Sequence, residues 1–190
     1  MTKKYAIRNI QGFSFVELMV VIALIGILSA IGLPSFLRSL PEKRLKNAAR
    51  NMYVDLQRAR LLAVKENKDV TVTFDTAAGT YSFPDGDGTT GAALADYGAV
   101  RYGCAIAANN WKDPSGPLVA GTRTTFMNNT IMFRSRGTAE IDDGAGNFVL
   151  LTGEEGVLLQ SENDQTVCYA VTVSGVGTVR IYRYDGSAWE

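Results

Sequence analysis

The chain has 190 residues and equal numbers of basic and acidic residues, 19 of each. This length allows one domain of ordinary size plus an appendage. It contains no histidine, the commonest general base and metal ligand, so no Ser/His/Asp set exists. A GxxxxGK[ST] phosphate-binding loop is also missing. We therefore expect a protein that is not an enzyme and needs no cofactor or metal.

The first twelve residues carry Lys3, Lys4 and Arg8 and no acid. The remainder holds 16 basic residues (19 − 3) and 19 acidic ones, a net charge of −3. A slightly acidic body has no overall attraction for nucleic acid, so DNA is not an expected partner.

An apolar run follows, in which Glu17 is the one ionisable residue between Phe13 and Leu33. As a helix, this run would rise roughly 30 Å, about the thickness of a bilayer's hydrocarbon core. A secretory signal peptide is the alternative, but its apolar region is about 7 to 15 residues long. The run therefore predicts a transmembrane helix. Basic residues flank it on both sides, so charge alone does not decide its orientation.

Glu17 needs an explanation, because a carboxylate at the centre of a span costs about 2.5 to 3.5 kcal/mol. It lies one turn after Phe13, near the expected membrane boundary, where the cost is smaller and a helix N-terminus favours negative charge. Taken alone, Glu17 is a tolerated boundary acid. Pro34 ends the run, and a proline there usually kinks a helix.

The stretch "GFSFVELMVVIALIGILSAIGLP" resembles the class III signal of type IV pilins and type II secretion pseudopilins. It places Glu17 fifth and Pro34 twenty-second after the junction of Gly12 and Phe13. The resemblance implies that residues 1–12 are a leader, that prepilin peptidase cleaves after Gly12, and that the new amine of Phe13 is N-methylated.

The same resemblance implies that residues 13–34 form a transmembrane and filament assembly segment. There Glu17 would pair with the N-terminal amine of a neighbouring pilin or pseudopilin. Such a pair is strong in a low-dielectric core, relative to leaving either charge alone.

Beyond Pro34, apolar residues recur with spacings of four and three, which predicts an amphipathic helix over about 42–67. Its buried stripe would be Leu45, Ala49, Met52, Leu56, Ala59 and Ala63. Off the stripe lie residues expected on a solvated face, with a functional basic groove as the alternative: Arg50, Gln57, Arg58, Arg60 and Lys65.

From Asp69 the pattern has period two and is typical of strands. "DVTVTFD" and "TYSFPDG" predict a hairpin across "TAAGT"; four further strands are expected in "TIMFRSRGTAEI", "NFVLLT", "QTVCYAVTVSG" and "GTVRIYRYDG". The expected fold is α+β, a long N-terminal helix packed on antiparallel sheets. Residues 85–125 read as a long irregular loop with one short strand near "GAVRYG".

Two acidic turns and two cysteines remain. "PDGDGTTG", with Asp85 and Asp87, lacks the ligand series of an EF-hand, so a glycine-rich turn is preferred over a calcium site; "IDDGAGN" reads as a hairpin turn. Cys104 and Cys168 would form a disulfide in an oxidising compartment, and two buried free thiols are an equal alternative.

The body resembles the GspH/FimT minor pseudopilin family in "LQRARLLAVKENKDVTVTF", "IMFRSRGTA" and "YAVTVSGVGTVRIYR". This implies a periplasmic GspH/FimT-like domain over residues 35–190 and a pilin-like fold. It also implies a minor subunit, single-pass in the bacterial inner membrane, that assembles near the tip of a filament.

Three functions stay open. One is a subunit of a type II secretion pseudopilus or type IV pilus, and another is a lone membrane-anchored or secreted β domain. The remaining one is a FimT-like DNA receptor, whose motif reads Gly-Arg-x-Arg. Here the matching residues run from Gly177 to Arg180, so the first arginine is missing. Arg183 is the next candidate contact, but strand alternation places it opposite Arg180.

Overall fold

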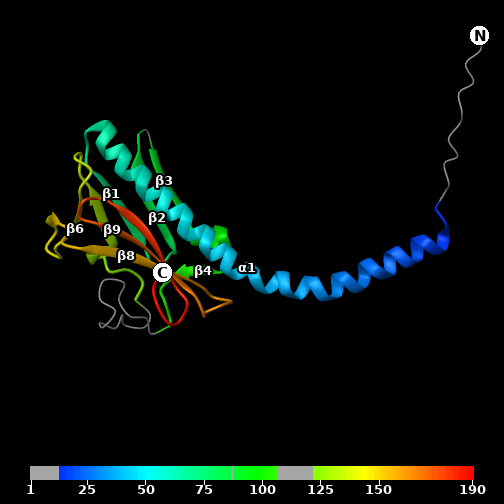
Figure 1. The fold of residues 1–190 in the computed structure, drawn as a ribbon. Coiled ribbons are helices and arrows are strands. Elements are labelled where there is room, and N and C mark those ends of the chain that lie inside the picture. Colours follow the sequence, from blue (N-terminus) through cyan, green and yellow to red (C-terminus); the bar gives the residue numbers. More distant parts are fainter. Residues whose placement is uncertain (1–12, 87, 107–121) are drawn as a thin grey trace, which may run out of the picture. The chain divides into compact units, whose positions relative to one another are not determined.

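The computed structural model describes residues 13–86, 88–106 and 122–190. One long helix, α1 (Phe15–Glu66), precedes two antiparallel sheets, as Figure 1 shows. This is the α+β fold that the sequence predicts. The chain forms two compact units, Met1–Leu40 and Pro41–Glu190, which are described separately below.

The sheets share one pattern, in which every pair of neighbouring strands is antiparallel. The larger has the order β3-β2-β1-β5-β6-β7. Its strands are β1 (Val70–Asp75), β2 (Thr80–Asp85), β3 (Gly88–Ala93), β5 (Thr130–Phe133), β6 (Ala139–Asp142) and β7 (Phe148–Leu150). The smaller has the order β10-β9-β8-β4, with β4 (Val100–Tyr102), β8 (Glu154–Ser161), β9 (Cys168–Ser174) and β10 (Val179–Tyr184). Two short 3-10 helices are η1 (Leu94–Tyr97) and η2 (Met127–Asn129).

Helix α1 continues through Pro34 and ends at Glu66. Asn67 then adopts a positive φ of 51°, and the Lys68 amide donates to the Ala63 carbonyl at 3.1 Å. A left-handed residue with this backbone bond is a common helix stop, because it satisfies a carbonyl at the helix end. The helix thus ends close to the bound expected near residue 67, and the kink at Pro34 stays a prediction.

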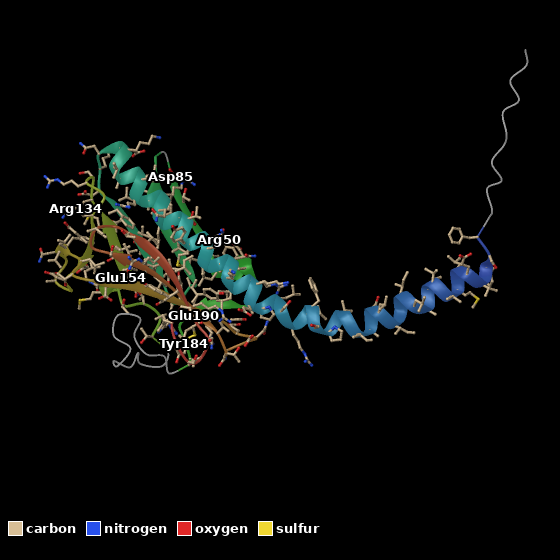
Figure 2. All side chains as sticks on the ribbon, in the orientation of Figure 1. Arg50, Asp85, Arg134, Glu154, Tyr184 and Glu190 are labelled. Carbon is tan, nitrogen blue, oxygen red and sulfur yellow. A yellow bond between two sulfur atoms is a disulfide. The ribbon has the colours of Figure 1, made fainter. Side chains whose placement is uncertain are left out.

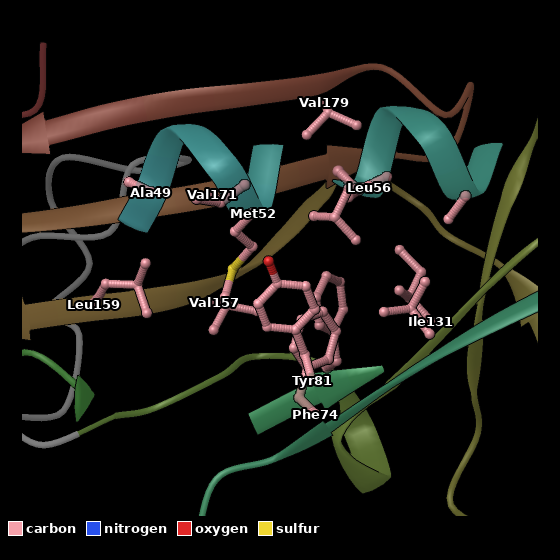
Figure 3. Packing of buried hydrophobic residues seen from close by; sticks show 14 of the residues in the cluster. Ala49, Met52, Leu56, Phe74, Tyr81, Ile131, Val157, Leu159, Val171 and Val179 are labelled. Carbon is pink, nitrogen blue, oxygen red and sulfur yellow. The ribbon is translucent and has the colours of Figure 1, made fainter. Parts of the chain in front are cut away.

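The main core lies between the second part of α1 and both sheets. All six residues of the predicted stripe are at most 1% exposed, and Ala48 joins them. Figure 3 shows Met52 and Leu56 above Phe74 of the larger sheet, and Val171 of the smaller sheet belongs to the same cluster. One helix face therefore covers two sheets at once.

The expectation of an irregular loop over residues 85–125 is wrong for its first part. That stretch contains β3, η1 and β4, of which the sequence predicted only the strand near "GAVRYG"; residues 107–121 lie outside the described part. β3 reads "GTTGAA", in which the two threonines are the only residues typical of strands. Its Gly91 approaches β2 so closely that an added Cβ would lie 2.0 Å from the Tyr81 carbonyl oxygen. The glycine at position 91, which favours a loop in a sequence-based prediction, is thus required by close contact between the two strands.

Two other strand predictions need correction, whereas the hairpin of β1 and β2 is confirmed. "TIMFRSRGTAEI" forms two strands, β5 and β6, that pair with each other through the turn between them. Strand β8 was missed, because it begins with two glutamates and then runs without alternation. Its last six residues are all buried, since Val157 faces the main core and Leu158 a second cluster on the other face.

That second cluster contains a disulfide between Cys104, just after β4, and Cys168, the first residue of β9. Both cysteines are buried, beside Leu158, Ala170 and Tyr184. Of the two alternatives that the sequence left open, the structure has the bridge. It links the segment after the edge strand β4 to the central strand β9.

Replacing Leu56 by Ala should lower the free energy of unfolding by about 2 to 5 kcal/mol, because Leu56 is fully buried where helix and sheets meet. The matched control is Leu61→Ala on the same helix, where the side chain is 66% exposed. That change should stay within about 0.5 kcal/mol. Urea unfolding of both variants measures the difference, and equal effects would contradict the assignment of the buried face.

The disulfide predicts that unreduced, denatured protein takes up no thiol label, whereas reduced protein takes up two. Since the bridge joins residues 64 apart, its loss in Cys104→Ala should cost up to about 4 kcal/mol in the chain-entropy model. The variant should take up one label at Cys168. Two labels on the unreduced, unaltered chain would show that the thiols are free.

Candidate functional site

The N-terminal part of α1 exposes an apolar surface. Large apolar side chains from Phe13 to Leu37 are between 41% and 82% exposed, and Figure 2 shows side chains projecting from the helix there. An 18-residue window of the helix has a mean hydropathy of 2.6, and none of it is buried. By length and composition it is apolar enough to cross a membrane. So large an apolar surface requires lipid or protein to cover it.

Glu17 lies in the first turn of α1 and is exposed. Phe13 is two residues before the helix, and the Leu18 amide donates to the Ser14 carbonyl at 3.1 Å in the first helical bond. The structure thus places the predicted amine-bearing residue and the predicted acid one turn apart at the same helix end. Gly12 and the rest of the predicted leader, residues 1–12, lie outside the described part of the chain.

The two arginines considered as DNA contacts are both engaged by carboxylates. Arg180 Nη1 donates to Glu154 Oε1 at 2.8 Å and to the Tyr182 hydroxyl at 3.5 Å. Arg183 Nη2 donates to Oε1 of Glu42, a residue of α1, at 3.0 Å. The Tyr182 and Glu154 contacts raise the pKa of Arg180, and Glu42 raises the pKa of Arg183. Both cations are therefore neutralised within the chain.

The two side chains also lie on opposite faces of β10. Ile181 packs against the main core under α1, and Tyr182 and Tyr184 belong to the cluster around the disulfide. Since side chains alternate along a strand, Arg183 lies on the helix face and Arg180 on the other. The structure does not bring them together.

Arg58 and Arg60 were expected on a solvated face of the helix. Arg58 is exposed, as expected, and it also forms an ion pair with Asp85 at the end of β2. Arg60 Nε donates to the Gly137 carbonyl at 2.9 Å, and its Nη2 donates to the Val176 carbonyl at 3.1 Å. Its long side chain thus extends from the helix to the carbonyl groups of two turns. A contact of this kind between distant segments leaves little signal in the sequence.

The two turns held by Arg60 touch each other at Gly177, whose φ is 75°. A Cβ there would lie 2.0 Å from the Gly137 carbonyl oxygen and 2.7 Å from Arg60 Nε. Glycine is required because both the conformation and the space exclude a side chain. The glycines of "FRSRG" and "SGVG", quoted above for the family resemblance, thus form one structural unit with the helix.

The segment "IDDGAGN", predicted to be a hairpin turn, connects β6 and β7. Asp142 accepts from the Gly144 amide at 2.7 Å, and Asp143 accepts from the Ala145 amide at 2.8 Å. Hydrogen bonds, led by the Asn128 side chain for Asp142 and the Ala145 amide for Asp143, lower the pKa of each carboxyl. Within residues 13–86, 88–106 and 122–190 no group of three or more potential ligands could hold a metal ion; Asp87 lies outside them.

Comparisons with known proteins address both parts of the chain. Two crystal structures of the type IV minor pilin FimU from Pseudomonas aeruginosa are similar, one in space group P65 and one in P21. The first has 15% sequence identity and a TM-score of 0.43, covering 77% of this chain and 97% of the other. The second has 14% identity and a TM-score of 0.44, covering 78% and 94%. The search of curated proteins found no match.

Two protein families also match this chain. Residues 7–33 match the family described as prokaryotic N-terminal methylation motif, which contains the junction before Phe13 and Glu17. Residues 48–177, more than half of the chain, match the family described as type II transport protein GspH. This range includes the buried helix stripe from Met52 onward, Arg60 and both glycine turns. The chain carries an N-terminal methylation motif and belongs to the GspH family of type II transport proteins.

Proposed function

We propose that this chain is a minor pseudopilin that prepilin peptidase cleaves after Gly12 and that becomes N-methylated at Phe13. Residues 13–34 then hold it in the inner membrane as a single span, with residues 35–190 in the periplasm. The observation that carries the proposal is the unburied apolar helix that begins in the methylation motif. In this proposal the subunit has a structural role, since it binds neighbouring subunits and catalyses no reaction.

The filament that it joins is, in this proposal, a type II secretion pseudopilus, with the chain in few copies at or near the tip. The match to the GspH family over residues 48–177 favours protein secretion. A type IV pilus is the related alternative. In either filament the apolar surface of the helix passes from lipid to the helices of neighbouring subunits, so it stays covered.

Glu17 is proposed to guide this transfer by pairing with the Phe13 amine of a neighbouring subunit. A carboxylate in an apolar bundle is costly alone and stabilising when paired with a cation. Its position in the exposed first turn leaves it accessible to another subunit.

Glu17→Ala should therefore abolish or strongly reduce incorporation into filaments, while membrane insertion and processing continue. Removing the acid lowers the cost of burying the helix in lipid, so insertion should be at least as efficient. Mass spectrometry of membrane-extracted protein checks processing through a chain that begins at methylated Phe13. Immunoblotting of sheared filaments checks incorporation.

Glu17→Gln is the matched control for shape, because it keeps the size of the side chain and removes its charge. It should fail like Glu17→Ala if charge pairing matters. Normal assembly of either variant would refute the pairing. A chain that keeps Met1, or one cleaved near Ala30, would instead refute the processing step.

DNA uptake is the alternative function, and the ion pairs of Arg180 and Arg183 argue against it. Non-specific affinity for DNA grows with the number of phosphates neutralised, and these two cations are separated and already paired. We expect the compact unit Pro41–Glu190 not to shift duplex DNA at about 1 µM protein and about 150 mM salt, on the order of typical non-specific affinities.

An electrophoretic mobility assay tests this expectation. Salt-sensitive binding that disappears in Arg180→Ala would favour DNA uptake over secretion. Binding that survives Arg180→Ala and disappears in Arg50→Ala would place the contact on the helix, where Arg50 is exposed.

A further inference from the structure

Two adjoining cavities lie beside β4, the edge strand of the smaller sheet. The larger, about 480 Å³, is lined by all three residues of β4 and by the turn between β1 and β2. The smaller, about 220 Å³, is lined by β4 residues and the segment that follows them. Arg101, Tyr102 and Arg123 line both. We treat the two cavities as one, the β4 groove.

The β4 groove carries an unbalanced positive charge. Arg101 and Arg123 are exposed, and among the described residues no carboxylate forms an ion pair with either. Arg123 Nη1 donates to the Thr76 carbonyl at 3.2 Å, which holds this side chain at the turn. Among the described residues that line the groove, Glu162 is the one acidic residue. Two arginines thus share this lining with a single carboxylate.

Other arginines of the sheets differ in this respect. Arg180 and Arg183 are paired, as described above, and Arg134 bonds both Asp69 and Glu140. Figure 2 labels Arg134 and Glu154, two members of these ion pairs. A third cavity, about 300 Å³ and lined by Arg134 and Arg136, contains its own two acids. Among the described residues, the third cavity thus has equal numbers of cations and anions, whereas the lining of the β4 groove has two cations and one anion.

We propose that the β4 groove binds an extended acidic peptide segment of a protein partner. β4 pairs with β8 along one edge, and it is the last strand of its sheet, so its other edge has no strand partner in the described residues. An extended peptide can add to such an edge through main-chain hydrogen bonds. Carboxylates of the peptide would meet Arg101 and Arg123, whose planar groups match a carboxylate in geometry.

Other polar side chains around the groove already form hydrogen bonds within the chain, so the arginines are left to bind a ligand, and arginines favour an acidic one. The Tyr102 hydroxyl donates to the Thr80 carbonyl at 3.0 Å, and the buried Gln160 accepts from the Ala105 amide at 2.9 Å. Among the side chains named here, the two guanidinium groups then offer the donors for a ligand, beside the main chain of the β4 edge. Nucleic acid fits less well, since two cations beside Glu162 neutralise few phosphates.

The test is independent of filament assembly, because it measures peptide binding by the full chain in detergent micelles. The probe is a fluorescein-labelled hexapeptide of alternating glutamate and valine, followed by anisotropy. Binding should be saturable, should weaken with added salt, and should weaken for the same peptide with glutamine in place of glutamate. The double variant Arg101→Gln, Arg123→Gln should bind at least about tenfold more weakly, since it loses charge-assisted hydrogen bonds.

Arg136→Gln is the matched control, because it removes an exposed arginine from the charge-balanced third cavity. It should bind the peptide like the unaltered chain. The proposal is overturned by an absence of saturable binding to the unaltered chain, by equal weakening in the control, or by tighter binding of a single-stranded DNA oligonucleotide. Thiol labelling of each variant verifies that the disulfide beside the groove has formed.

Discussion

The body of this protein depends on the packing of one helix face onto two sheets. Four alanines of α1 let the helix approach the strands closely, and larger side chains fill the space between them. Full burial of a leucine or methionine contributes about 1.5 to 3 kcal/mol. Because residues of both sheets contact the same stripe, loss of this packing would separate the sheets from each other as well as from the helix.

Polar contacts then determine where the helix lies along the sheets. The Tyr81 hydroxyl donates to Asp55 at 2.5 Å, and burial raises the pKa of this tyrosine. Arg58 pairs with Asp85, and Arg60 bonds the carbonyls of two turns. Apolar packing tolerates some sliding, whereas these bonds require one register. These bonds also engage two arginines of the helix, so neither is left to attract an anionic ligand, whereas the described lining of the β4 groove keeps an excess of positive charge.

A single helix thus serves two environments with different physical demands. After Pro41, α1 is amphipathic and its apolar stripe is covered by its own sheets. Between Leu18 and Leu33, it is apolar on all sides and uncovered within the described part of that unit. An all-round apolar helix is the pattern expected for lipid or for a bundle of similar helices. This division of one element agrees with the proposed passage from membrane to filament.

Much of this organisation follows from local sequence alone. The apolar run, Glu17 near its start and the stripe from Leu45 to Ala63 are set by spacing along one helix, so they could be predicted without a structure. The hairpin of β1 and β2 is equally local. The tertiary structure decided what depends on contacts between distant residues. These are β3, whose Gly91 reflects close approach to β2, the partners of Arg60 and Arg183, and the meeting of Arg101 with Arg123 in one groove. A sequence shows which residues can pack or pair, but pairing across long separations depends on how the sheets place them.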